Sequence, residues 1–475
     1  MGSKADLVVI GSGGAAFAAA IRATGMGKSV VMIEKGTIGG TCVNTGCVPS
    51  KALLAAADAR HTAADLSRFP GLTGSTTPVD MRALVDGKQT LVDSLRTEKY
   101  IDVAASYGWR VVTGTASFSG TPQDPTVTIV DSEGQVETIE AEQYLIATGS
   151  TPWIPAIEGL DTVDYLTSTT AMELATLPEA LLIVGGGYVA LEQAQLFARL
   201  GVKVTMLVRS RLASSEEPEA SIALGEVFAD EGIHVIDHAT VTRIHTGDDG
   251  RVTATVAAND TTEEHQGDRI LVATGRRPVT DNLGLDTVQV KTSETGAVIV
   301  TDQLQTSNRR IWAAGDATGH HEFVYVAAHH GAMVVDNAFA AAGRTVDYSH
   351  VPRVTFTSPA LARVGATEKD LLAAGLRCDC RVLPLQYVPR AIVNRDTRGF
   401  IKIVVDADTG RIHGLTAVAK DAGEIAAAGV YLLNAGMTIT DVANTWAPYL
   451  TMAEGIKIAA QSFTTDVSQL SCCAV

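Results

Sequence analysis

A glycine-rich pattern that occurs twice, each time between an expected strand and an expected helix, constrains the fold of this chain most strongly. The first copy, GSGGAA at residues 11–16, follows the apolar run Asp6 to Ile10. The second copy, GGGYVA at residues 185–190, follows the apolar run Leu181 to Val184. Glycines at these spacings let the backbone approach a pyrophosphate, and the N-terminus of the following helix attracts its charge. The sequence therefore predicts two doubly wound α/β units that each bind a dinucleotide.

The residues that follow the second strand of each unit indicate which nucleotide it binds. In the first unit the expected strand from Ser29 to Ile33 ends at Glu34, whose carboxylate can accept ribose hydroxyls. In the second unit the expected strand 202–208 is followed by Arg209 and Arg211 with no acid. Two arginines suit a 2′-phosphate, so the second unit is expected to prefer NADPH. The alternative is that they are ordinary surface arginines.

A pair of cysteines follows the first unit. Cys42 and Cys47 are separated by four residues and precede an Ala/Leu-rich segment, Lys51 to Ala59, that is expected to be helical. Thiols near the start of a helix are stabilised as thiolates, which favours a redox-active dithiol. The alternative for two spaced cysteines is apolar filling of the core.

Length and charge exclude several classes of protein. The 475 residues exceed what a single core accommodates, so several domains are expected. A net charge of −16 argues against nucleic acid and anionic membranes as partners. No run of eighteen apolar residues occurs, so no membrane span is expected. Six cysteines in so long a chain do not make a secreted disulfide framework, and a reducing cytoplasm is the expected location.

Three further apolar strands end in short signatures. The runs 144–149 and 270–275 both end in Ala-Thr-Gly, and the run 311–316 ends in Gly-Asp before a helix expected from about Val324. An aspartate at this point can bind the ribityl chain of a flavin. From about Val351 the pattern alternates strands (353–356, 400–405 and 411–417) with helices, which predicts an α+β domain. The expected domains are 1–150, 151–275, 276–345, which returns to the first domain, and 346–475.

Taken together, these motifs resemble the flavin-linked pyridine nucleotide–disulfide oxidoreductases, the family of glutathione reductase, over nearly the whole chain. The resemblance implies FAD on the first unit, NADPH on the second, and a C-terminal interface domain that forms a homodimer. It implies that Cys47 faces the flavin, that Cys42 exchanges with substrate, and that Lys51 pairs with Glu192. The cofactor-binding residues so implied are Gly11, Gly13, Gly14, Ala16, Glu34, Gly40, Thr41, Lys51, Ala116, Thr148, Gly149, Gly185, Gly187, Tyr188, Glu192, Arg209, Arg211, Gly275 and Asp316.

The chain departs from this family near its C-terminus. Disulfide reductases of the family carry His-Pro-Thr-x-x-Glu, with the histidine as acid/base for thiol exchange, whereas this chain places Tyr449 before Thr451 and Glu454. A phenol with a reference pKa of about 10 replaces an imidazole that titrates near 6.5. Such a group is poorly suited to splitting a disulfide substrate near neutral pH, so chemistry without that proton transfer is expected.

A second pair of cysteines, Cys472 and Cys473, lies in the tail and suggests a soft metal ion as the substrate. With Tyr188 and Tyr449 also present, the chain resembles the mercury-reducing branch of the family. The resemblance implies that Hg(II) arrives as thiol complexes, and that the tail thiols of one subunit pass it to Cys42 and Cys47 of the partner subunit. The alternatives are an incidental exposed thiol pair in the tail, a reductase of small-molecule disulfides, or a mercury-sequestering protein with a vestigial flavin site.

Three weaker clusters complete the sequence reading. Cys378 and Cys380 flank Asp379 and could chelate a metal, although alternate residues on a strand share a face and a structural role is favoured. The histidine pairs 320–321 and 329–330 could likewise be ligands. Helix-surface or flavin-adjacent polar roles are favoured for these histidines.

Overall fold

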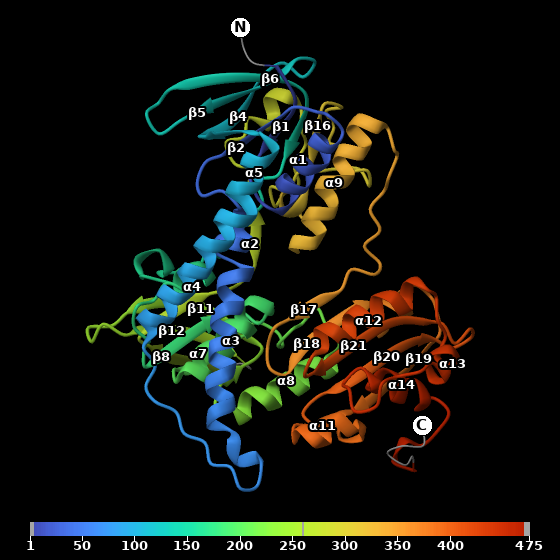
Figure 1. Cartoon of the computed structure of the whole chain (residues 1–475). Coiled ribbons are helices and arrows are strands. Elements are labelled where there is room, and N and C mark those ends of the chain that lie inside the picture. The colour runs from blue at the N-terminus through green and yellow to red at the C-terminus, as the bar shows by residue number, and fades with distance from the viewer. Residues whose placement is uncertain (1–3, 259–260, 470–475) are drawn as a thin grey trace. The chain divides into compact units, whose positions relative to one another are not determined.

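The computed structural model describes residues 4–258 and 261–469, which form two compact units (Figure 1). The first unit contains the residues up to Ala52, then Ala83–Trp153 and Gly275–Asp347. The second contains Leu53–Arg82, Ile154–Thr274 and the residues from Tyr348 onward. The division into functional domains at residues 150, 275 and 345 stays a prediction. No helix in the described ranges is both long and apolar enough to cross a membrane.

A parallel sheet forms the centre of the first unit. Its central strands are apolar on both faces, because one face packs against helices and the other packs against antiparallel strands of the same unit. The parallel strands follow the order β3 (Arg110–Thr113), β2 (Val30–Glu34), β1 (Lys4–Ile10), β6 (Val136–Ile146) and β16 (Ile311–Ala313). The long β6 also continues into an antiparallel sheet with β5 (Pro125–Val130) and β4 (Thr115–Gly120).

Two helices pack closely on one face of this sheet. Helix α1 (Gly14–Gly25) lies beside α9 (Val324–Ala340) (Figure 1). Gly331 allows this approach, because a Cβ there would lie 2.0 Å from the carbonyl oxygen of Ala15. The remaining elements of this unit are α2 (Gly40–Asn44), most of α4 (Met81–Arg96), a π-helical turn (Thr97–Ile101), α5 (Asp102–Tyr107), and the paired short strands β7 (Ser150–Pro152) and β15 (Arg276–Pro278).

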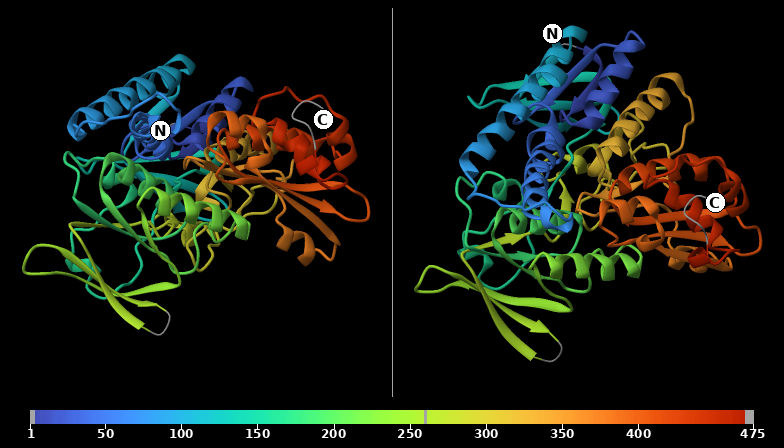
Figure 2. Two further views of the ribbon diagram at one scale, coloured as in Figure 1. Left: turned by 90° about the horizontal axis from the view of Figure 1, so that it is seen from below. Right: turned by 60° about the horizontal axis from the view of Figure 1, so that its bottom comes forward.

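The second nucleotide-binding pattern forms a smaller parallel sheet in the second unit. Its order is β10 (His234–Ile236), β9 (Lys203–Leu207), β8 (Ala180–Val184) and β14 (Arg269–Val272), with α7 (Tyr188–Leu200) and α8 (Pro218–Asp230) connecting its strands. An antiparallel sheet of β11 (Ala239–Thr246), β12 (Val252–Ala258) and β13 (Thr261–Gly267) follows, and its long strands are clear in Figure 2. Short helix α6 (Ser168–Ala171) precedes β8.

The C-terminal part is an antiparallel sheet with helices. The strand order is β17 (Arg353–Thr355), β18 (Ala360–Gly365), β21 (Ile412–Ala419), β20 (Phe400–Asp406) and β19 (Cys378–Pro384). One continuous apolar core joins this sheet to α12 (Ala422–Asn434) and α14 (Glu454–Gln461). Short helices α10 (Glu368–Ala373), α11 (Pro389–Asn394) and α13 (Ile439–Asn444) complete it. The expected fold class, two doubly wound units and an α+β C-terminal part, is confirmed.

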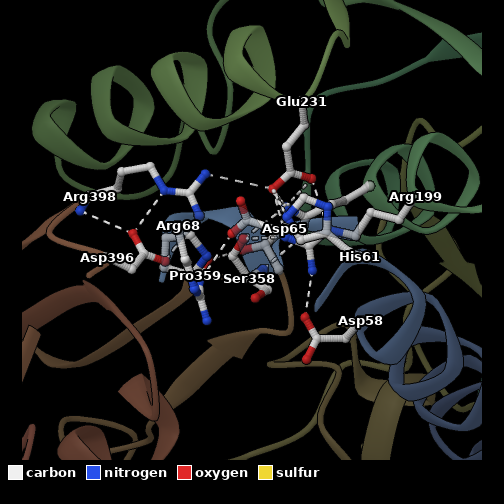
Figure 3. Close-up of polar contacts among 12 residues, drawn as sticks. Asp58, His61, Asp65, Arg68, Arg199, Glu231, Ser358, Pro359, Asp396 and Arg398 are labelled. Atoms are coloured by element: carbon white, nitrogen blue, oxygen red, sulfur yellow. Dashed lines mark hydrogen bonds and ion pairs between the residues drawn. The ribbon is translucent and has the colours of Figure 1, made fainter. Parts of the chain in front are cut away.

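A buried polar cluster joins four segments of the second unit (Figure 3). Arg199 at the end of α7 is bidentate to Glu231, with nitrogen–oxygen distances of 2.6 and 2.8 Å. Its third nitrogen donates to Asp58 at 2.6 Å, and one amino group also donates to the carbonyl oxygen of Ser358 at 2.8 Å. The side chains of Arg199 and Glu231 are 4% and 5% exposed. Such a pair stabilises the fold only while both partners are present.

Candidate functional site

The first glycine loop has the geometry that a dinucleotide requires. Gly11 adopts a φ of +109°, and a Cβ there would lie 2.3 Å from the carbonyl oxygen of Ala147, so only glycine fits. Gly40, with a φ of +67°, approaches equally closely, because its Cβ would lie 2.5 Å from the Cα of Gly13. Helix α1 begins after Gly13 without a side-chain cap, so its first N–H groups face the loop. Gly14 and Ala16 pack inside this turn, and Thr41 follows Gly40 in α2.

Glu34 lies at the end of β2, as the sequence predicts for an acid that binds ribose. One carboxylate oxygen accepts from the hydroxyl of Ser12 at 2.6 Å, and the other accepts from the N–H of Gly36 at 2.8 Å. Ser12 in turn accepts from the N–H of Gly39 at 3.1 Å. These contacts fix the carboxylate beside the glycine loop.

A second group of predicted residues follows the neighbouring strands β6 and β16. The hydroxyl of Thr148 is buried and has no hydrogen-bond partner within the described ranges, so it is available to a ligand. Asp316 accepts from the hydroxyl of Ser150 at 2.6 Å. Because β6 and β16 pair in parallel, these residues lie at the carboxyl ends of adjacent strands, where α/β sheets bind their ligands. The orphaned hydroxyl and the glycine-only loop both fit a flavin dinucleotide.

Two further residues that the sequence analysis assigned to cofactor binding, Gly149 and Ala116, also lie in the first unit. Gly149 has a φ of +70°, and its carbonyl accepts from the N–H of Val279 at 2.9 Å. Ala116 on β4 is buried in the core of the unit, so its side chain packs there. Any contact between Ala116 and the cofactor stays a prediction.

One thiol of the pair lies in the short helix α2, and the other lies at the start of the longer helix that follows. Cys42 lies in α2 and is partly buried, whereas Cys47 is the exposed first residue of α3 (Cys47–Ala64). Helix α3 thus begins four residues before the expected start at Lys51, which places Cys47 directly at a helix N-terminus. Neither cysteine forms a disulfide bond.

The two thiols differ in their electrostatic environment. The hydrogen bond to Cys47, then burial, then the charge of Cys47 raise the pKa of Cys42, while the charge of Lys51 opposes the rise. The lowered pKa expected for thiols near a helix start is therefore not found for Cys42, because its contact with Cys47 and its burial raise the pKa.

Tyr100 is a neighbour of this pair that the sequence analysis missed. Burial raises the pKa of its phenol, and the charges of Cys42 and Cys47 add to the rise. The ring packs against Phe17 with centroids 4.8 Å apart. Tyr100 lies in the π-helical turn 97–101, and such turns are frequent at functional sites but have no clear sequence signal.

The second glycine loop repeats the geometry of the first. Gly185 has a φ of +137°, and a Cβ there would lie 2.3 Å from the carbonyl oxygen of Ala273. Gly187 precedes α7 without a side-chain cap and has open space at its Cβ position. Tyr188, which follows, is 40% exposed. Glu192, one turn further along α7, is buried and accepts from the N–H of Phe356 at 2.9 Å.

The two arginines after β9 have different environments. Arg209 is exposed and makes no hydrogen bond or ion pair with the rest of the described chain. Arg211 donates to the carbonyl oxygens of Glu216 and Ser214 at 2.7 and 3.0 Å, and to the hydroxyl of Ser221. Arg209 is therefore available to a 2′-phosphate, whereas Arg211 holds the loop that follows. Gly275, whose φ is +126°, follows the second Ala-Thr-Gly strand.

The predicted residues near the C-terminus are described only in part. Tyr449 is 48% exposed. Glu454 is buried and accepts from the N–H of Leu450 at 3.1 Å; burial raises its pKa and this hydrogen bond opposes the rise. Cys472 and Cys473 lie outside the described residues. Lys51 belongs to the first unit, while Tyr188, Glu192 and Tyr449 belong to the second, so their predicted cooperation stays a prediction.

The histidine pairs and the pair Cys378 and Cys380, which the sequence left open as metal ligands, have different environments in the structure. His330 is fully buried, and its Nδ1 accepts from the N–H of Gly315 at 3.2 Å, beside the predicted ribityl-binding Asp316. His330 therefore has a polar role inside the first unit, and its place beside a flavin stays a prediction. Cys378 and Cys380 are joined by a disulfide bond, which the sequence analysis did not predict.

Comparison with known proteins places this geometry in a family context. A family model described as pyridine nucleotide-disulphide oxidoreductase matches residues 5–331, and the dimerisation domain of the same family matches residues 351–460. The chain is 55% identical to a mercuric reductase from Streptomyces lividans, over 99% of this chain and 98% of that protein. It is 45% identical to a mercuric reductase from Staphylococcus aureus, over 99% of this chain and 84% of that one.

Solved structures show a similar fold. The copper(II) complex of the flavoprotein disulfide reductase RclA from Escherichia coli matches with a TM-score of 0.86 and 28% identity, over 98% of this chain and 100% of that chain. LpdA from Mycobacterium tuberculosis matches with a TM-score of 0.84 and 27% identity, over 97% of this chain and 100% of that chain.

Proposed function

The chain belongs to the pyridine nucleotide-disulphide oxidoreductase family, and we propose that within this family it reduces Hg(II) to elemental mercury with electrons from NADPH. The observation that carries the proposal is the 55% identity to a mercuric reductase over almost the full length of both proteins. Cys42 and Cys47, which form no disulfide bond, support it, because thiolates select soft cations.

Members of this family use FAD and NADPH, and FAD relays two electrons from the nicotinamide to the substrate when it is bound. We assign FAD to the first unit, where Gly11 and Gly40 admit the pyrophosphate and Glu34 binds the ribose. Thr148 and Asp316 would hold the rest of the flavin nucleotide. NADPH would bind to the second unit.

The preference for NADPH depends on the loop after β9. Arg209 would bind the 2′-phosphate, since its guanidinium is exposed and makes no other contact within the described ranges. Arg211 would support that contact by holding residues 214–221 in place. Gly185 and Gly187 would admit the pyrophosphate.

The dithiol would bind the metal by ligand exchange. Hg(II) bound to two small thiols exchanges with Cys42 and Cys47, which forms two protein–mercury bonds and releases two small thiols. Cys42, the sulfur expected to exchange with substrate, would accept the ion first, and Cys47 would then complete the pair. The overall reaction consumes one NADPH and one Hg(II) and yields NADP⁺, one proton and Hg(0).

The C-terminal thiols would deliver the ion. The matched dimerisation domain indicates a homodimer. We propose that Cys472 and Cys473 of one subunit capture thiol-bound Hg(II) for Cys42 and Cys47 of the partner subunit. Mixed dimers test this relay: a subunit that lacks Cys42 and Cys47, paired with one that lacks Cys472 and Cys473, regains one working site. Mixed dimers as inactive on thiol-bound mercury as both parents would exclude transfer between subunits.

The second candidate is a reductase of small-molecule disulfides, which the similarity to RclA favours at 28% identity. Tyr449 argues against it, because a phenol replaces the imidazole that protonates the leaving thiol. A sequestering protein would bind Hg(II) without consuming NADPH. These functions separate in one anaerobic assay that compares NADPH oxidation with Hg(II) in excess thiol, with glutathione disulfide and with lipoamide. The proposal expects turnover with Hg(II) alone, and rapid turnover of a disulfide would replace it by the second candidate.

A further inference from the structure

A second pair of cysteines lies on an edge strand of the C-terminal sheet. Cys378 and Cys380 occupy alternate positions of β19, so their side chains share one face of the strand. Their Cα atoms are 6.0 Å apart, and both residues are partly exposed. β19 is the last strand in the order β17-β18-β21-β20-β19, which leaves one of its edges unpaired within the sheet. These cysteines belong to the second unit, whereas Cys42 and Cys47 belong to the first.

A carboxylate from another element reaches the same place. Glu368 is the first residue of α10, and one of its oxygens lies within 4.8 Å of both sulfurs, which themselves lie within that distance of each other. Within the described ranges, no other group of three or more histidine, cysteine or acidic side chains meets the same condition. Two sulfurs and one carboxylate oxygen are a donor set that suits a soft or borderline divalent cation.

Glu368 is held in this position by buried partners. Its carboxylate accepts from the ammonium of Lys402 at 2.9 Å, and its backbone N–H donates to Glu217 at 2.8 Å. Lys402 also donates to the carboxylates of Glu219 and Glu217, at 2.9 and 3.1 Å. The side chain of Lys402 is 1% exposed. An ion pair of this kind orients a metal ligand from behind, as outer partners do in known metal sites.

We propose that Cys378, Cys380 and Glu368 bind a divalent d¹⁰ cation such as Zn(II) or Cd(II) when the cysteines are reduced. Two molecules of a small thiol reduce the disulfide, which yields two protein thiols and one small-molecule disulfide. Metal binding then releases the two thiol protons and forms two metal–sulfur bonds and one metal–oxygen bond. Water fills the fourth position of a tetrahedron.

The local geometry permits this change. Zinc–sulfur bonds of about 2.3 Å in a tetrahedron place the two sulfurs about 3.8 Å apart. Rotation of the two side chains can open the sulfurs to this separation, because the Cα atoms are already 6.0 Å apart. The carboxylate oxygen, within 4.8 Å of each sulfur, needs to approach by only about 1 Å. The bound ion would tie α10 to the edge strand, and oxidation to the disulfide would release it.

This site does not include the redox dithiol, so it can be tested by metal binding without measuring the proposed reduction of mercury. The FAD-containing full-length protein with serine at positions 42, 47, 472 and 473 retains only Cys378 and Cys380 as thiols. After reduction with a phosphine it is titrated with Cd(II), and the ultraviolet thiolate-to-cadmium band is recorded. We expect one Cd(II) per chain, and no band before reduction. Binding that is equally strong before reduction, or the absence of a band afterwards, would overturn the proposal.

Two variants separate coordination from local charge. Glu368→Gln should weaken Cd(II) binding at least about tenfold, as loss of a ligand or its partner does in other sites. Asp379→Asn is the matched control: Asp379 lies between the cysteines but points to the other face of β19, where it pairs with Arg381 at 2.7 Å. Asp379→Asn should bind as the parent does. Equal weakening in both variants would show that only local negative charge matters.

A measurement on the wild-type protein tests the same site without any substitution. Cd(II) should protect Cys378 and Cys380 of the reduced wild-type enzyme from iodoacetamide, as read by mass spectrometry of their shared peptide. Protection should disappear when a chelator removes the metal. Alkylation at the same rate with and without Cd(II) would contradict the site.

Discussion

The buried His330 gives the protein a specific sensitivity to acid. Its ring is fully buried on α9, and Nδ1 accepts a hydrogen bond from Gly315 that protonation would abolish. Burial, followed by the charges of His320, His329 and His321, lowers the pKa of His330 from 6.5 to about 4. Above pH 6.5 neither the folded nor the unfolded chain holds a proton at this site, so it contributes no pH dependence there.

Below pH 6.5 the unfolded chain binds a proton at this histidine and the folded chain does not. The free energy of unfolding therefore falls as the pH is lowered to about 4. The difference between 6.5 and about 4, at about 1.36 kcal/mol per pH unit, corresponds to about 3 kcal/mol. His330→Gln keeps an acceptor for the N–H of Gly315 but does not titrate. This variant should therefore lose about 3 kcal/mol less than the wild type between pH 7 and pH 4.

The assay is urea unfolding at a fixed protein concentration across this pH range, with the difference between wild type and variant taken at each pH. His234→Gln is the control, because His234 is exposed on β10 in the other unit and its loss should leave the pH dependence unchanged. Parallel stability curves for wild type and His330→Gln would refute the reasoning. They would mean that the buried ring titrates as it does in water.

Three further perturbations have defined outcomes. Arg199→Met leaves Glu231 buried without its bidentate partner, and should lower the free energy of unfolding by about 3–5 kcal/mol in a denaturant titration; a loss below about 1 kcal/mol would show that water reaches the pair. Arg209→Ser removes a charge-assisted contact of about 1.5–3 kcal/mol, so it should raise the KM for NADPH roughly tenfold or more and hardly change that for NADH; equal changes for both nucleotides would contradict the assignment. With the flavin oxidised, Cys42→Ala should show a long-wavelength thiolate-to-flavin absorption band and Cys47→Ala should lack it, and the reverse pattern would exchange the roles of the two sulfurs.

Local patterns in the sequence were sufficient to predict the elements that carry the nucleotide sites. The strand before Gly11 and the helix after it follow from a buried apolar run and a loop that only glycine can form, and the same holds around Gly185. Glu34 lies at the strand end because the spacing from Gly11 fixes one helix and one strand between them. These features depend on residues that are close together in the chain, so a local sequence pattern is enough to predict them.

Features that depend on particular side-chain contacts escaped the sequence analysis. Glu368 lies close to Cys378 and Cys380 because Lys402, from another strand, holds its carboxylate there. No spacing of residues in the sequence predicts this contact. The pKa of Cys42 is raised by its contact with Cys47, which opposes the effect of the helix start that the sequence indicates. In both cases the outcome depends on which side chains come into contact, and the sequence pattern does not specify this.

The most direct test of the central claim is the stoichiometry of mercury release. The enzyme is supplied anaerobically with NADPH and Hg(II) in excess small thiol, and Hg(0) vapour is measured against the NADPH consumed. We predict one Hg(0) per NADPH for the wild type and none for the variant with serine at Cys42 and Cys47. Mercury vapour released at the wild-type rate by that variant, or NADPH consumed without mercury vapour, would contradict reduction of Hg(II) at this dithiol.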